Sequence, residues 1–141
     1  MSAPMTAEQV YARMARLPFY VVLMQPTGRY QPDSEPGREL MRAHLQWQLE
    51  LEEEGRLLAA GPLNYGQPVR RDHPIVNAGG MYIIAAASDQ EAAEIAAQEP
   101  FAVAGWRTYV VCSWLLNEGV ARECAAAVID RFGPGGAAAA G

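Results

Sequence analysis

The order in which strand-like and helix-like segments follow one another constrains the fold of this chain more than any other feature of its sequence. Segments that read as strands lie at 19–24, 56–63, 80–87 and 106–115; the second is a short apolar run that stops at Gly61-Pro62, and the others contain aromatic and β-branched residues. Apolar residues recur at helical spacing over 38–54, and Ser88 with Glu91 forms a capping box for a second helix, which Pro100 closes. The order β-α-β-β-α-β predicts an α+β fold of the split βαβ, or ferredoxin-like, kind.

One further helix is predicted at each end of this core. Thr6 and Gln9 form a capping box for a helix that ends at Pro18, and a C-terminal helix is expected from about residue 118 to 131. The 141 residues fit one domain, which we place at 1–132 with its core at 19–115. The remaining residues, 133–141, are almost all glycine and alanine, and we expect this tail to be disordered.

The predicted strands are apolar on both faces. Residues 19–24 read FYVVLM, so both alternating sets of side chains are apolar or aromatic. Two crossover helices cover only one face of an antiparallel sheet, so something else must cover the other face. A second copy of the same sheet would do so, which predicts a homodimer of the dimeric α+β barrel kind. The two terminal helices are the alternative cover.

The composition excludes several classes of chemistry. All 11 basic residues are arginines scattered along a chain of net charge −5, which argues against a nucleic-acid partner. Without lysine there is no Schiff base, no pyridoxal phosphate enzyme and no phosphate loop with its lysine. The two histidines and two cysteines match no metal-binding spacing. We therefore expect neither a metal nor a cofactor.

The sequence shows no sign of membrane contact. No apolar run approaches the roughly 20 residues that span a bilayer. The first residues lack the basic start and apolar core of a signal peptide. We therefore expect a cytoplasmic protein.

His44 lies in the middle of the apolar stripe of the first predicted core helix, between Leu40 and Trp47. Two interpretations are open. A core histidine would bond a backbone carbonyl, since an unpaired buried polar group costs about 1–3 kcal/mol. Alternatively, His44 is a general acid or base held in a dry pocket.

Four parts of the sequence carry a family pattern: His44, GRLLAAGPL at 55–63, SDQEAAEIAAQEPFAVAGW at 88–106 and VVCSWL at 110–115. Over about residues 19–115 the chain resembles the YCII-related (YciI-like) family. The resemblance implies a dimeric α+β barrel similar to that of the muconolactone isomerase group. It also implies a cavity between sheet and helices with a histidine–aspartate catalytic pair. His44 matches the histidine, and Glu99 stands where the family usually has aspartate; a solvated carboxylate at a helix end is the alternative interpretation of Glu99.

Four other side chains are candidates for substrate binding. Arg107, in an otherwise apolar strand, could bind a substrate carboxylate or phenolate, or pair with a helix glutamate. The hydroxyls of Tyr20, Tyr82 and Tyr109 could line the cavity, although strand tyrosines usually belong to the core. His73, in a charged loop, is expected in a solvated turn.

These residues lead to three functional hypotheses. The first is a cofactor-independent lyase or isomerase in which His44 moves a proton on a small cyclic or aromatic substrate and Glu99 orients the imidazole. Elimination, dehydration and double-bond migration share this first step. The second is a non-catalytic small-molecule binding or accessory protein, favoured by the glutamate in place of aspartate. The third is a cofactor-free monooxygenase. Convergence of His44 and Glu99 on one cavity with a free ring nitrogen would favour an enzyme.

Overall fold

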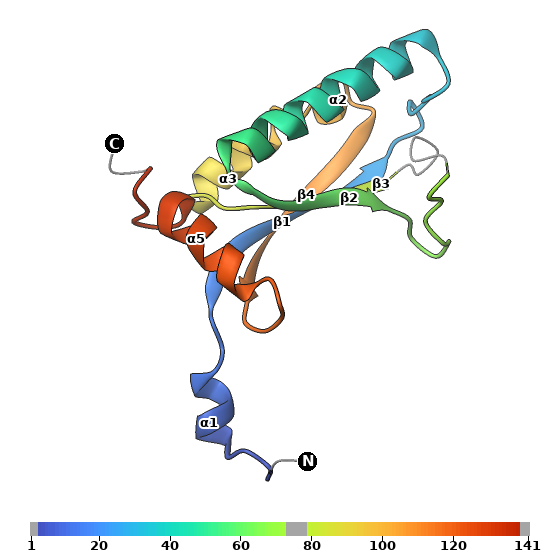
Figure 1. The fold of residues 1–141 in the computed structure, drawn as a ribbon. Helices are drawn as coiled ribbons and strands as arrows, with labels where there is room; N and C mark the ends of the chain where they lie inside the picture. Colours follow the sequence, from blue (N-terminus) through green and yellow to red (C-terminus); the bar gives the residue numbers. More distant parts are fainter. Residues whose placement is uncertain (1–2, 73–78, 139–141) are drawn as a thin grey trace.

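The structure, a computed structural model, describes residues 3–72 and 79–138. These residues form a four-stranded antiparallel sheet with the strand order β2-β3-β1-β4. The strands are β1 (Leu17–Pro26), β2 (Leu57–Leu63), β3 (Gly79–Ile84) and β4 (Arg107–Leu116). This is the order that a β-α-β-β-α-β chain produces, and it confirms the predicted ferredoxin-like α+β fold (Figure 1).

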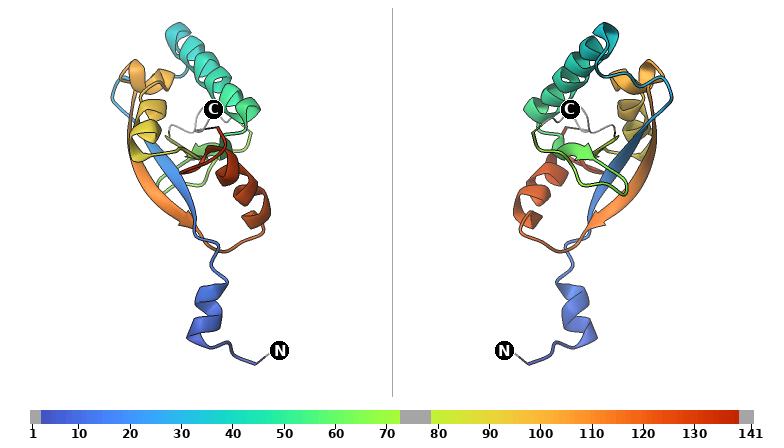
Figure 2. Two further views of the ribbon diagram at one scale, coloured as in Figure 1. Left: turned by 90° about the vertical axis from the view of Figure 1, so that its left-hand side faces the viewer. Right: turned by 90° about the vertical axis from the view of Figure 1, so that its right-hand side faces the viewer.

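Three helices pack on one face of the sheet: α2 (Glu35–Glu54), α3 (Asp89–Ala96) and α4 (Pro100–Val103). Figure 2 shows α2 at the top of the domain with α3 and α4 beside it, and the C-terminal helix below α2. The main core lies between the sheet and these three helices. Its buried members are Tyr20, Val22, Met24, Leu51, Tyr82, Ile84, Ala86, Ala92 and Ala96.

The element boundaries differ from the predicted ones mainly at prolines. α2 begins at Glu35, three residues earlier than predicted, with the Ser34 side chain accepting a hydrogen bond from the Gly37 amide. The second core helix ends at Ala96, and Pro100 opens α4 instead of closing α3. Proline is tolerated in a first helical turn because the amide that it lacks would have no partner there.

The second face of the sheet is covered at one end by α5 (Arg122–Phe132). Phe19 of β1 meets Ala125 and Phe132 of α5 in a second buried cluster, which also contains Leu116. One of the two terminal helices therefore supplies part of the cover that the apolar strands require.

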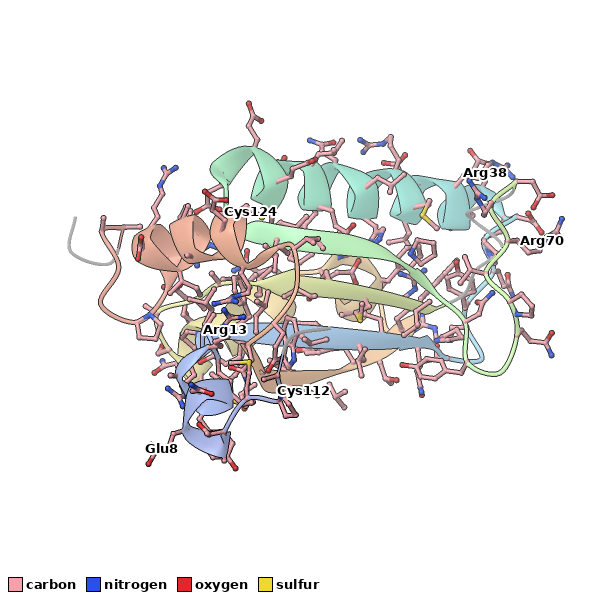
Figure 3. The ribbon with its side chains drawn as sticks, turned by 60° about the horizontal axis from the view of Figure 1, so that its bottom comes forward. Glu8, Arg13, Arg38, Arg70, Cys112 and Cys124 are labelled. Atoms are coloured by element: carbon pink, nitrogen blue, oxygen red, sulfur yellow. The ribbon has the colours of Figure 1, made fainter. Side chains whose placement is uncertain are left out.

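The rest of this face is open. Met81, Val110 and Trp114 are 37%, 56% and 40% exposed, and Cys112 is exposed on the side of the sheet away from α2 (Figure 3). We call these four residues the open patch. They lie on β3 and β4, to either side of β1.

The N-terminal helix covers no part of the sheet. α1 (Ala7–Ala12) buries none of its residues and extends away from the domain (Figure 1). The segment that follows α1 is held by Asn117, whose backbone and side-chain oxygens accept hydrogen bonds of 3.0 Å from the amides of Ala15 and Arg16. The helix ends at Ala12 and not at Pro18 as predicted, and residues 13–16 separate it from β1, which begins at Leu17.

At the C-terminal end, the chain folds back after α5. The amides of Ala137 and Ala138 donate hydrogen bonds to the carbonyls of Asp130 and Arg131. The last three residues of the predicted tail, 139–141, lie outside the described residues.

Candidate active site

A buried histidine–carboxylate pair lies between α2 and the start of α4. His44 Nδ1 is 2.6 Å from Glu99 Oε1. The exposed fractions of the two residues are 8% and 0%. The sequence separates them by 55 positions, and they meet because α2 and α4 pack side by side on the same face of the sheet. The alternative of a solvated Glu99 does not hold.

Both carboxylate oxygens of Glu99 have partners. While Oε1 faces His44, Oε2 accepts a hydrogen bond of 2.8 Å from the backbone amide of Ala102. Glu99 is thus the N-cap of α4, and this bond satisfies one of the amides that a helix start leaves unpaired. The side chain that orients the histidine is therefore itself fixed by a backbone hydrogen bond.

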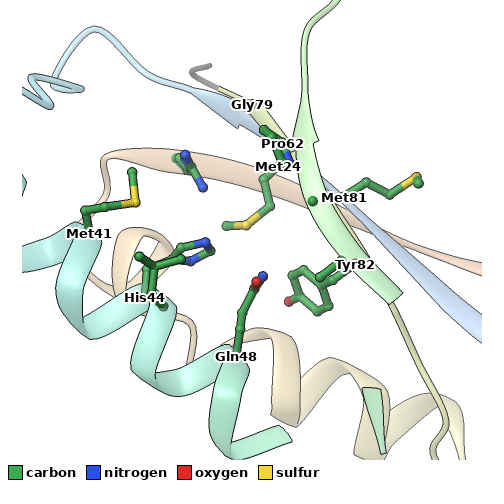
Figure 4. A pocket seen from close by; sticks show the side chains of 13 residues that line it. Met24, Met41, His44, Gln48, Pro62, Gly79, Met81 and Tyr82 are labelled. Atoms are coloured by element: carbon green, nitrogen blue, oxygen red, sulfur yellow. The ribbon is translucent and has the colours of Figure 1, made fainter. Parts of the chain in front are cut away.

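The pairing sets the orientation of the imidazole. Because an ionised carboxylate only accepts hydrogen bonds, the Nδ1 of His44 carries the proton and Nε2 is left as the basic nitrogen. No described residue is hydrogen-bonded to Nε2. The ring points into a cavity of about 350 Å³ between α2 and the sheet (Figure 4).

The cavity has an apolar wall and a few polar side chains. Its larger apolar side chains are Met24, Met41, Leu45 and Pro62, and its polar ones are His44, Gln48, Tyr82 and Arg107. Gln48 lies one helical turn after His44 on α2 and faces the same cavity (Figure 4). We did not predict Gln48 from the sequence, although its i+4 spacing from His44 was the available signal.

Arg107 begins β4 and is 5% exposed. Its Cζ lies 4.4 Å from the ring centre of Phe101 and 5.2 Å from that of Tyr30, and its Nη2 donates to the Tyr30 hydroxyl at 3.4 Å. None of the ion pairs between described residues includes Arg107. The alternative of a helix glutamate as its partner is therefore not found in the described part of the chain.

The three predicted tyrosines have different environments. Tyr82 lines the cavity and is 1% exposed, and burial, followed by the nearby Glu99 and Tyr109, raises its pKa far above the ordinary value. Tyr20 does not line the cavity. Its hydroxyl donates to Asp89 at 2.6 Å, and burial together with this hydrogen bond raises the pKa of Tyr20 to about 12. Tyr109 is half-buried against the core and also lies outside the cavity lining.

Three further expectations concern a metal ion, a membrane span and His73. Among the described residues, no group of three histidine, cysteine or acidic side chains is arranged to hold a metal ion. No helix within the described ranges has the length and apolar character needed to span a membrane. His73, which we expected in a solvated turn, lies outside the described residues.

Fold and site together define a class of protein: an α+β domain of ferredoxin-like topology with a buried histidine–carboxylate pair beside a cavity between helix and sheet. Within that class the chain belongs to the family of YCII-related domains, whose family model matches residues 18–115. The match confirms the resemblance inferred from the sequence. It leaves α1 and α5 outside the family region.

Among solved structures, the chain is similar to 5-chloro-2-hydroxyhydroquinone dehydrochlorinase from Burkholderia phenoliruptrix AC1100, in complex with 2,5-dihydroxybenzoquinone. The sequence identity is 21% and the TM-score is 0.50, and the match covers 68% of this chain and 92% of that chain. At this level of identity the likeness shows a shared fold. No curated protein sequence matches the chain.

Proposed function

We propose that this protein is a cofactor-independent lyase or isomerase that moves a proton on a small cyclic or aromatic compound. The observation that carries the proposal is the 2.6 Å contact between His44 Nδ1 and Glu99 Oε1 at the wall of a largely apolar cavity with a few polar side chains. The structurally similar dehydrochlorinase supports the reaction class, because loss of a proton and a chloride from a ring compound also requires a base.

In this proposal His44 is the general base and Glu99 its positioning residue. Glu99 holds the Nδ1–H tautomer, so that Nε2 faces the substrate and takes a proton from it. The electron pair of the broken bond then forms a double bond as a leaving group departs, which is elimination or dehydration. In an isomerase the proton returns at another carbon. Glu99 stabilises the imidazolium that exists between the two steps.

Burial of the pair makes this arrangement more effective. Hydrogen bonds and charge interactions are stronger where water is excluded, and neither His44 nor Glu99 is substantially exposed. The Ala102 amide holds the carboxylate in place before substrate binds, so little reorganisation is needed during the reaction.

The hypothesis of a non-catalytic binding protein depended on one sequence feature, the glutamate at position 99 where the family usually has aspartate. The longer side chain of Glu99 nevertheless reaches both His44 and Ala102. This exchange therefore no longer counts for a binding-only role. The presence of glutamate in place of aspartate does not favour the monooxygenase alternative either.

His44→Gln tests the proposal. We expect a loss of about 10² to 10⁴ in rate with little change in ligand affinity, since general acid–base catalysis typically contributes that much. The measurement is deuterium uptake from D₂O into a panel of cyclic phenols and enols, followed by NMR, with chloride release from 5-chloro-2-hydroxyhydroquinone as a second readout.

Glu99→Gln should give a smaller loss, because it keeps the shape of the side chain and removes the charge that stabilises the imidazolium. Glu118→Gln makes the same chemical change at an exposed position and should leave the rate unchanged. If His44→Gln folds normally and turns over substrate at the wild-type rate, the proposed base is wrong and a binding role replaces it.

A further inference from the structure

Two buried side-chain atoms in the described part of the chain have no hydrogen-bond partner: Tyr82 Oη and Arg107 Nε. Both residues line the cavity into which His44 points. Buried polar atoms in folded proteins are almost always paired, and leaving one unpaired costs free energy. Two unpaired donors beside one cavity therefore indicate that a bound molecule completes their pairing.

We propose that the substrate of this cavity is an oxyanion, whose carboxylate or ionised hydroxyl group is bound by Arg107 and Tyr82. This inference rests on the proposed function, because it names the class of substrate that the same cavity would bind. It adds a charge requirement that the His44–Glu99 pair alone does not impose.

The charge argument begins with Arg107. A guanidinium keeps its proton at any physiological pH, so a positive charge lies at this buried position. The rings of Phe101 and Tyr30 stabilise it, but neither ring carries a formal charge that balances it. Residues 73–78, which are not described, contain no aspartate or glutamate. Glu99 has its two oxygens committed to His44 and Ala102.

Tyr82 complements this charge as a neutral donor. Burial, with Glu99 and Tyr109 nearby, raises its pKa, so the phenol keeps its proton at physiological pH. A protonated hydroxyl beside a guanidinium offers hydrogen-bond donors to the same region of the cavity. Hydrogen-bond donors that have no acceptor in the protein suit a ligand group that is negatively charged and rich in lone pairs.

Phe101 relates this anion site to the base. Its ring centre lies 5.4 Å from that of His44 and 4.4 Å from Arg107 Cζ, so the imidazole and the guanidinium are within about 10 Å of each other. A single six-membered ring with one acidic substituent can bridge such a span. Its anionic oxygen would face Arg107 while a ring proton faces His44 Nε2. Charge that develops on the ring after proton removal can then delocalise towards the oxygen that Arg107 binds.

The test compares two probes of the same shape. Benzoate and benzamide differ in charge but hardly in size, and binding of each is measured by isothermal titration calorimetry. We expect wild-type protein to bind benzoate at least tenfold more tightly than benzamide. Arg107→Gln should abolish this preference, and Arg107→Lys, which keeps the charge, should retain part of it. Tyr82→Phe should weaken benzoate binding severalfold.

One control variant and one further probe complete the comparison. Arg122→Gln removes an exposed arginine on α5 and should leave the preference for benzoate unchanged. Titration with 2,5-dihydroxybenzoquinone, whose acidic hydroxyls ionise below neutral pH, separates the two kinds of oxyanion. Tighter binding of benzoate assigns the site to a carboxylate, and tighter binding of the quinone assigns it to an ionised hydroxyl.

The outcomes separate this inference from the proposed reaction. His44→Gln should leave the preference for benzoate intact, so a failure of the proposed base would not remove the anion site. If wild-type protein binds benzoate no more tightly than benzamide, or if folded Arg107→Gln keeps the preference, the anion site is wrong even where His44 proves to be the base. The wild-type comparison needs no variant and stays decisive if a substitution prevents folding.

Discussion

Among single residues, those around the cavity differ most in how completely their polar atoms are paired. Glu99 uses both carboxylate oxygens within the protein, whereas Tyr82 and Arg107 each retain a buried atom without a described partner. A buried side chain whose polar atoms all have hydrogen-bond partners is held rigidly. We interpret Glu99 as fixed support for His44, and Tyr82 and Arg107 as the groups that meet the substrate.

A single residue could be predicted where its role shows in the local sequence, and not where its role depends on contacts between distant segments. His44 was singled out by its place on an apolar helix stripe, and Glu99 by the family resemblance. The three tyrosines share a strand context in the sequence. Only the register of the sheet puts Tyr82 at the cavity and the Tyr20 hydroxyl on Asp89. The pairing of Glu99 with Ala102 depends on a four-residue helix that the sequence pattern did not predict.

An ion pair at the start of α3 makes stability depend on acidic pH. Arg56 Nη1 lies 2.6 Å from Glu91 Oε1, and the Ala87 amide donates to the same oxygen. Burial opposes ionisation of Glu91, but the hydrogen bonds from Arg56 and Ala87 outweigh it and hold the pKa of Glu91 below its ordinary value of 4.5. A depressed carboxyl pKa stabilises the folded state above the unfolded-state pKa, and this stabilisation is lost as the pH falls through the folded-state value.

We therefore expect Glu91→Gln to lower the free energy of unfolding at pH 7 by up to about 1 kcal/mol, the usual range for a partly exposed pair. The difference from wild type should shrink as the pH falls below the ordinary carboxyl range, and it should vanish once the carboxyl is protonated in both the folded and the unfolded state. Urea unfolding over a series of pH values from 7 downwards checks this. A difference that does not shrink as the pH falls would show that Glu91 acts through its shape and not its charge.

At the level of elements, α2 matters most because it carries both His44 and Gln48 into the cavity. The sequence predicts the start of this helix three residues too late, because Pro36 and Gly37 are typical of loops. In the structure Pro36 occupies the first helical turn and Ser34 caps it. Gly37 is buried there, and a methyl group on its Cα would overlap the carbonyl oxygen of Gln31.

Gly37→Ala should therefore destabilise the protein by about 1–3 kcal/mol, the typical effect of forcing extra volume into a packed site. It should also lower the activity that depends on His44, because the added methyl displaces the start of α2. Thermal unfolding and the deuterium-uptake rate measure the two effects.

Gly28→Ala is the matched control for this substitution. A Cβ at position 28 would meet no atom within 4 Å, so the variant should be as stable as wild type. Equal stability of the two variants would mean that the approach of α2 to Gln31 does not constrain the fold.

For the whole molecule, the order of strands and helices was predictable because each strand and each helix is apolar enough to be recognised locally. The sequence also indicated that two helices leave one sheet face uncovered. It did not indicate that α5 covers one end of this face while α1 covers none of it, because that depends on where the chain turns after β4.

We propose that a second copy of the chain covers the open patch formed by Met81, Val110, Cys112 and Trp114. The apolar side chains of this patch lie together on one sheet face and are more exposed than a folded domain normally leaves such a group. We expect light scattering to give a dimer at micromolar concentration. Val110→Asp, which places a charge in the patch, should give a monomer.

Val103→Asp is the control for the dimer experiment. Val103 is 70% exposed on α4, on the opposite side of the sheet, so its substitution should leave the dimer intact. A monomeric wild-type protein, or a Val110→Asp variant that still forms the wild-type dimer, would contradict the proposed role of the open patch.

The two bonds of Glu99 have a consequence for how this site would diverge among descendants of the chain. The same carboxylate orients His44 and caps α4, so selection for a stable fold alone would preserve it after activity had been lost. His44 makes no capping bond, but its loss would leave Glu99 Oε1 buried without a partner, which destabilises the fold. We therefore expect descendants that have lost the activity to keep the pair or to change both residues together.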